Sequence, residues 1–134
     1  MVDVILVGDS MGMVLYGMDN TREITDEIMI RHASAVKKAS NKSLVFFDLP
    51  YSKKFSEDNI VRRTLKIFNQ TKCDGVKIEG NSELVDVIKY LTKKSIPVMA
   101  HVGLQPQKFS SASKFKIYGR KEDDLKNILK DCKA

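Results

Sequence analysis

The chain has 134 residues, 43% hydrophobic and 30% charged, which fits one globular domain and excludes disordered, collagen-like and low-complexity proteins. The net charge is +6, but the lysines are scattered in pairs without interleaved aromatic residues. We therefore read them as solvated surface and expect no nucleic-acid partner. We also expect no membrane partner, because no apolar run approaches the roughly 20 residues of a spanning helix. A start without a secretory signal and two cysteines without a CxxC pair indicate a cytoplasmic protein.

Four short apolar runs recur along the chain, each rich in Val, Ile or Phe and largely without polar alternation. Runs of this kind are typical of buried parallel strands. They are residues 2–7, 44–47, 75–78 and 97–100.

Segments with helical spacing of apolar residues lie between these runs. Thr25, Ser56 and Ser82 precede three such segments and are candidate N-caps. A further amphipathic stripe, 125–132, predicts a C-terminal helix, whereas 103–119 reads as an irregular loop. Strands that alternate with helices predict an α/β fold with a parallel sheet and right-handed crossovers. Because no linker divides the chain, we expect one domain over residues 1–134.

Polar side chains stand where each apolar run ends. Asp9 follows the first run and Asp48 the second. Lys77 and Glu79 belong to the end of the third, and His101 follows the fourth. Because active sites of parallel α/β proteins form at the carboxyl edge of the sheet, we expect these side chains to share a pocket.

The two aspartates are candidate ligands for a hard divalent cation. Magnesium prefers oxygen donors and usually keeps several waters, so Asp9 and Asp48 with substrate oxygens and water satisfy it. Glu79 is a possible third ligand, direct or through water. The alternative for each aspartate is a helix cap or a hydrogen bond that orders a loop.

The remaining polar residues each leave two interpretations open. Lys77 and Glu79 are two residues apart on a strand, so their side chains lie on the same face. They form either a structural ion pair or a functional pair, in which Lys77 is a cation for an anionic substrate and Glu79 is linked to the metal. His101 is either a hydrogen-bonded core histidine or part of the site. Ser10 can donate its hydroxyl and N–H to a carboxylate, and we read His32 as a packing or surface residue.

Several sequence blocks, in this order, resemble the ketopantoate hydroxymethyltransferase family. Val-Gly-Asp-Ser alone is shared with the wider phosphoenolpyruvate mutase and isocitrate lyase group, but the blocks together are specific. They are VILVGDSMGM at 4–13, GMDNT at 17–21, DLP at 48–50, VKIEG at 76–80, PVMAHVGLQPQ at 97–107 and YGR at 118–120.

The resemblance implies a (β/α)8 TIM barrel, of which about four β/α units are present, so that this chain is a partial barrel truncated at both ends. It implies transfer of a hydroxymethyl group from 5,10-methylenetetrahydrofolate to 3-methyl-2-oxobutanoate, giving 2-dehydropantoate in pantothenate biosynthesis. A Mg²⁺-stabilised enolate of the keto acid agrees with the carboxylates at the strand ends. The family is typically a cytoplasmic homo-oligomer.

The resemblance also implies residue roles. Asp9, Asp48 and Glu79 form the magnesium site, and Asp9, Ser10, Asp48 and Lys77 bind the substrate. Lys77 and His101 take the catalytic roles, with His101 facing the hydroxymethyl end of the product.

The family's general base, a glutamate on a later strand, has no counterpart in this chain. We therefore expect the chain alone not to turn over substrate. Two alternatives stay open. One is another Mg²⁺-dependent 2-oxo-acid enzyme of the phosphoenolpyruvate mutase and isocitrate lyase group. The other is a non-catalytic remnant that joins an oligomer or only binds metal.

Overall fold

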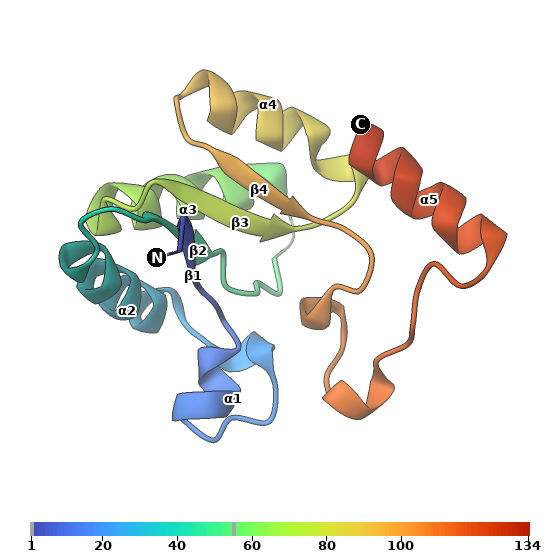
Figure 1. Ribbon diagram of the computed structural model, residues 1–134, viewed down its shortest axis with the longest axis horizontal. Coiled ribbons are helices and arrows are strands. Elements are labelled where there is room, and N and C mark those ends of the chain that lie inside the picture. The colour runs from blue at the N-terminus through green and yellow to red at the C-terminus, as the bar shows by residue number, and fades with distance from the viewer. Residues whose placement is uncertain (1, 55) are drawn as a thin grey trace.

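The computed structural model describes residues 2–54 and 56–134 and contains a four-stranded parallel sheet with the order β1-β2-β3-β4 (Figure 1). The predicted α/β fold with a parallel sheet is thus confirmed. Each strand lies within two residues of its predicted bounds, and β2, β3 and β4 each extend one residue further, into the polar strand ends. The strands are β1 (Val4–Val7), β2 (Leu44–Asp48), β3 (Gly75–Glu79) and β4 (Val98–His101).

Four longer helices follow the strands: α2 (Asp26–Ala39), α3 (Glu57–Thr71), α4 (Val85–Lys93) and α5 (Glu122–Lys133). Two of the predicted N-caps are confirmed, because Thr25 accepts a hydrogen bond from the N–H of Ile28 and Ser56 accepts one from the N–H of Asn59. No helix in the described part of the chain is long and apolar enough to cross a membrane.

The predicted cap at Ser82 is wrong. Ser82 is the first residue of a 3-10 turn, η2 (Ser82–Leu84), and its N–H donates to Asp131 Oδ1 of α5 at 3.1 Å. The turn forms where Leu84 folds back over Gly80, so closely that a Cβ on Gly80 would lie 2.0 Å from Leu84 Cδ1. The helix α4 then begins at Val85 without a side-chain cap.

The helices α2, α3 and α4 cover one face of the sheet (Figure 1). Alternate strand residues point into this core, among them Val45, Phe47 and Val76, each with no exposed surface. The opposite face is open, with Leu6 42% and Leu44 51% exposed. Because side chains alternate along a strand, the residues next to the core positions, including the site residues below, belong to this open face.

Two irregular segments hold the strand ends. After β1 the chain forms a short helix, α1 (Met11–Leu15), and a 3-10 turn, η1 (Thr21–Glu23), neither of which the apolar periodicity predicted. After β4 the predicted loop contains only the 3-10 turns η3 (Pro106–Lys108) and η4 (Ala112–Lys114) before α5. This loop starts at Gly103 and ends at Gly119, which have φ angles of +83° and +82°. Residues with a side chain rarely adopt a positive φ, so glycine suits both positions.

The pair Gly75 and Phe46 on neighbouring strands offers a test of this packing. A Cβ on Gly75 would lie 2.2 Å from Cε1 of the Phe46 ring. We expect Gly75→Ala to lower the free energy of unfolding by about 1–3 kcal/mol through overpacking, measured by urea denaturation. Adding Phe46→Leu should recover part of the loss; a double variant less stable than Gly75→Ala alone would contradict this cause.

Candidate active site

The strand-end side chains predicted from the sequence lie at one edge of the sheet. Asp48 is paired in register with Lys77, and the Lys77 Nζ donates to Asp48 Oδ1 at 2.7 Å. The backbone N–H of Asp9, directly after β1, donates to the other oxygen, Asp48 Oδ2, at 3.0 Å. The ends of three neighbouring strands are therefore joined through one buried carboxylate, which is 3% exposed.

The next strand adds Glu79 and His101, which are also paired in register. His101 Nδ1 lies 3.5 Å from Glu79 Oε1, a contact between ring and carboxylate that becomes an ion pair if the ring is protonated. Among the described residues, this buried Nδ1 has no hydrogen-bond partner. The His101 ring therefore lies beside the Glu79 carboxylate, and its Nδ1 makes no hydrogen bond there.

Gln107, in η3 of the loop after β4, connects Asp9 with the Glu79 side of the cluster. Its side-chain Nε2 donates to Asp9 Oδ2 at 2.8 Å and to the carbonyl oxygen of Leu49 at 2.9 Å. Its backbone N–H donates to Glu79 Oε2 at 3.0 Å. The sequence predicts no role for Gln107, because an amide in an irregular loop carries no periodic signal. Its only sequence signal is its place in the block 97–107.

The cluster carries excess negative charge, and Asp9 shows the consequence. The pKa of Asp9 is raised from 3.8 to about 6, mainly by burial and also by the nearby Asp48 and Glu79 carboxylates. The hydrogen bond from Gln107 and the positive charge of Lys77 oppose this rise. Asp9 is only 4% exposed. The site therefore holds an uncompensated carboxyl group that a cation would stabilise in its ionised form.

Ser10 and His32 are placed differently from the cluster. Ser10 is exposed and stands at the start of α1, next to Asp9 in the chain. A Cβ on Gly8 would lie 3.2 Å from Ser10 Oγ and 3.4 Å from Asp48 Oδ2, so this part of the loop passes close to the Asp48 carboxylate. His32 on α2 contacts the Tyr16 hydroxyl through Nε2 at 2.6 Å, in line with its reading as a packing residue.

Asp9 and Asp48 can provide two oxygen ligands for a divalent cation, but they do not form a complete metal site by themselves. Within residues 2–54 and 56–134, no three His, Cys, Asp or Glu side chains are arranged to hold a metal ion. The set Asp9, Asp48 and Glu79 therefore stays a prediction. Asp9 and Asp48 nevertheless fit Mg²⁺ by their chemistry, because both are carboxylates and the backbone of Asp9 lies against Asp48 in a site with surplus negative charge.

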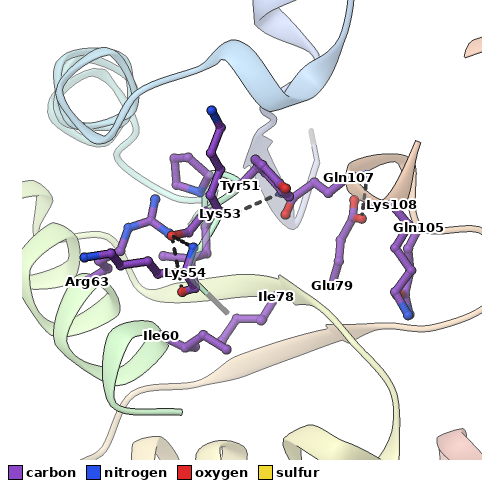
Figure 2. Close-up of a pocket in the computed structure, with 13 residues that line it drawn as sticks. Tyr51, Lys53, Lys54, Ile60, Arg63, Ile78, Glu79, Gln105, Gln107 and Lys108 are labelled. Carbon is purple, nitrogen blue, oxygen red and sulfur yellow. Dashed lines mark hydrogen bonds between the residues drawn. The ribbon is translucent and has the colours of Figure 1, made fainter. Parts of the chain in front are cut away.

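A pocket opens beside the cluster, and Figure 2 shows Glu79 and Gln107 facing each other at its edge. Its volume is about 170 Å³. Apolar side chains from β3, α3 and the loop after β2 line it, and basic side chains stand around them (Figure 2). The pocket thus adjoins the carboxylates on the side of α3, where a small ligand finds both apolar and cationic surface.

A parallel α/β sheet with acidic, basic and histidine side chains at its carboxyl edge defines a class of α/β proteins that bind small molecules at that edge. Within this class, the family model for ketopantoate hydroxymethyltransferase matches residues 1–134, so the chain belongs to the ketopantoate hydroxymethyltransferase family. The family predicted from the sequence blocks is thereby confirmed.

Curated relatives agree with this family. A 3-methyl-2-oxobutanoate hydroxymethyltransferase of Paramagnetospirillum magneticum is 42% identical over 98% of this chain and 48% of its own length. Proteins of the same name from Rhizobium rhizogenes and Brucella suis are 41% and 39% identical over 98% of this chain. The chain spans about half the length of the curated relatives it matches.

Proposed function

We propose that this chain contributes its strand-end cluster to the transfer of a hydroxymethyl group from 5,10-methylenetetrahydrofolate to 3-methyl-2-oxobutanoate, giving 2-dehydropantoate for pantothenate biosynthesis. The observation that carries the proposal is the joined arrangement of Asp9, Asp48 and Lys77 at the carboxyl edge of the sheet. The names of the relatives support the substrate and the type of transfer.

Asp9 and Asp48 are the residues that we propose to hold Mg²⁺, with Glu79 as a third ligand, directly or through water. A bound divalent cation supplies Lewis-acid stabilisation of the negative charge that develops on the keto oxygen when a 2-oxo acid loses its C3 proton. The buried, charge-crowded Asp9 supports this assignment, because its ionised form needs a compensating positive charge.

The other residues bind and orient the keto acid. The Lys77 ammonium, fixed by Asp48, offsets negative charge on the substrate carboxylate at a point where little water competes. Ser10 offers an exposed hydroxyl next to Asp9 for a second contact to the substrate. His101, beside Glu79, faces the hydroxymethyl end of the product in this proposal.

Removal of the C3 proton needs a general base, and we assign that role to no residue of this chain. Glu79 already accepts from Gln107 and contacts His101. We propose that residues 1–134 form one domain that is part of a (β/α)8 barrel in a cytoplasmic homo-oligomer. Without the rest of the barrel, we expect the chain to bind the keto acid and to produce no 2-dehydropantoate.

Calorimetry on the purified 134-residue chain tests this function. We expect 3-methyl-2-oxobutanoate to bind in the presence of Mg²⁺, more tightly than oxaloacetate or phosphonopyruvate, and Asp48→Asn to abolish the binding. A preference for oxaloacetate or phosphonopyruvate would instead favour a 2-oxo-acid enzyme of the phosphoenolpyruvate mutase and isocitrate lyase group. Folate-dependent formation of 2-dehydropantoate by the chain alone would refute the expected lack of turnover.

A further inference from the structure

We propose that Gln107 is a positioning residue that orients the Asp9 and Glu79 carboxylates for a divalent cation. This inference rests on the cation site of the proposed function and adds a residue from outside the sheet to it. The residue contacts acceptors that belong to the ends of three strands, although it stands on the loop after β4.

The geometry at Asp9 shows what the side chain of Gln107 does. Both hydrogens of its Nε2 are used, one on Asp9 Oδ2 and one on the Leu49 carbonyl oxygen. The amide therefore holds Asp9 Oδ2 and restrains the orientation of the Asp9 carboxylate. Within the described part of the chain, Asp9 Oδ1 has no hydrogen-bond partner, and so one oxygen of the fixed carboxylate stays available for a ligand.

The second contact extends the same arrangement to Glu79. The backbone N–H of Gln107 holds Glu79 Oε2, while Oε1 lies next to His101. This contact comes from the backbone, whereas the neutral side-chain amide donates to the Asp9 carboxylate without supplying the charge that a cation would supply. Donors of this kind orient metal-binding carboxylates in proteins, and their loss typically weakens metal binding about 10- to 100-fold.

Gln105 anchors the same loop without contacting the carboxylates, so it offers a structural comparison for Gln107. Gln105 is 2% exposed, and its Nε2 contacts Gly80 O at 3.0 Å, Asn81 Oδ1 at 2.8 Å and His101 O at 3.1 Å. Its side chain is directed away from that of Gln107 (Figure 2). The two glutamines thus form a matched pair on one loop, of which only Gln107 contacts the carboxylates of the cluster.

The test is Mg²⁺ titration calorimetry on the full chain, combined with thermal unfolding in EDTA. We expect Gln107→Met to weaken Mg²⁺ binding by about tenfold, because Asp9 loses its orienting donor. We expect Gln107→Lys to keep the thermal stability in EDTA, since an ammonium also donates to Asp9, yet to weaken Mg²⁺ binding at least as much by charge repulsion. We expect Gln105→Met to lower the melting temperature and to weaken Mg²⁺ binding less than Gln107→Met does, because it removes an anchor of the loop but no contact to a carboxylate.

Two results would overturn the inference while leaving the cation site in place: Gln107→Met binding Mg²⁺ as tightly as the parent chain, or Gln105→Met weakening binding to the same extent. A parent chain that binds no Mg²⁺ would overturn the cation site and this inference together. If Gln107→Met does not fold, Gln107→Lys decides, because normal Mg²⁺ affinity in that folded variant contradicts the proposed role.

Discussion

Asp48→Ala is expected to lower the free energy of unfolding by about 3–5 kcal/mol, because it leaves a buried cation without its partner. The side chains of Asp48 and Lys77 are 4% and 16% exposed, and their atoms are 2.7 Å apart. The same substitution removes the acceptor of the Asp9 N–H, so two donors lose their partner at once. Urea denaturation in EDTA measures the loss independently of any bound ion.

A second substitution separates the unpaired charge from other causes. In Asp48→Ala/Lys77→Met the buried ammonium is gone, and we expect more than half of the lost stability to return. If the single variant is unfolded at 25 °C, recovery of near-ultraviolet circular dichroism in the double variant gives the same information. A double variant that is no more stable than Asp48→Ala would show that the ion pair is not the cause.

The sequence predicted the strand ends well because one physical feature determines both the strands and the site. Short runs of Val, Ile and Phe without polar alternation are typical of strands in a parallel sheet, and parallel strands end at one edge. Asp9, Asp48 and Lys77 therefore came together as expected. The shared face of Lys77 and Glu79 followed from the two-residue period of a strand in the same way.

The features that the sequence did not predict depend on contacts between distant segments. Gln107 lies 98 positions from Asp9 in the chain, in a loop whose path is set by Gly103 and by the bonds of Gln105. Ser82 has the residue type of a cap, but it lies inside the turn η2, and its N–H donates to Asp131. Neither contact leaves a periodic pattern in the sequence, and so local rules could not find them.

Asp9→Asn is expected to stabilise the chain by about 3 kcal/mol at pH 7.5 in EDTA. The pKa of Asp9 is raised from 3.8 to about 6, so ionisation of this buried carboxyl opposes folding. The loss of folding free energy caused by ionising Asp9 is complete above about pH 6, shrinks as the pH falls and is absent below pH 3.8. An asparagine keeps an oxygen for the Gln107 donor and removes the charge, and hence the gain should nearly vanish at about pH 4.

Urea denaturation at both pH values checks this expectation, with the exposed Asp3→Asn as a control that we expect to have little effect at either pH. A gain for Asp9→Asn that is equally large at pH 4 would exclude ionisation as its cause. Adding Mg²⁺ at pH 7.5 should then stabilise the parent chain and not the variant, because only the ionised carboxylate gains from a bound cation. Stability lost in the free chain and regained with the ion is the behaviour expected of a charge retained for binding.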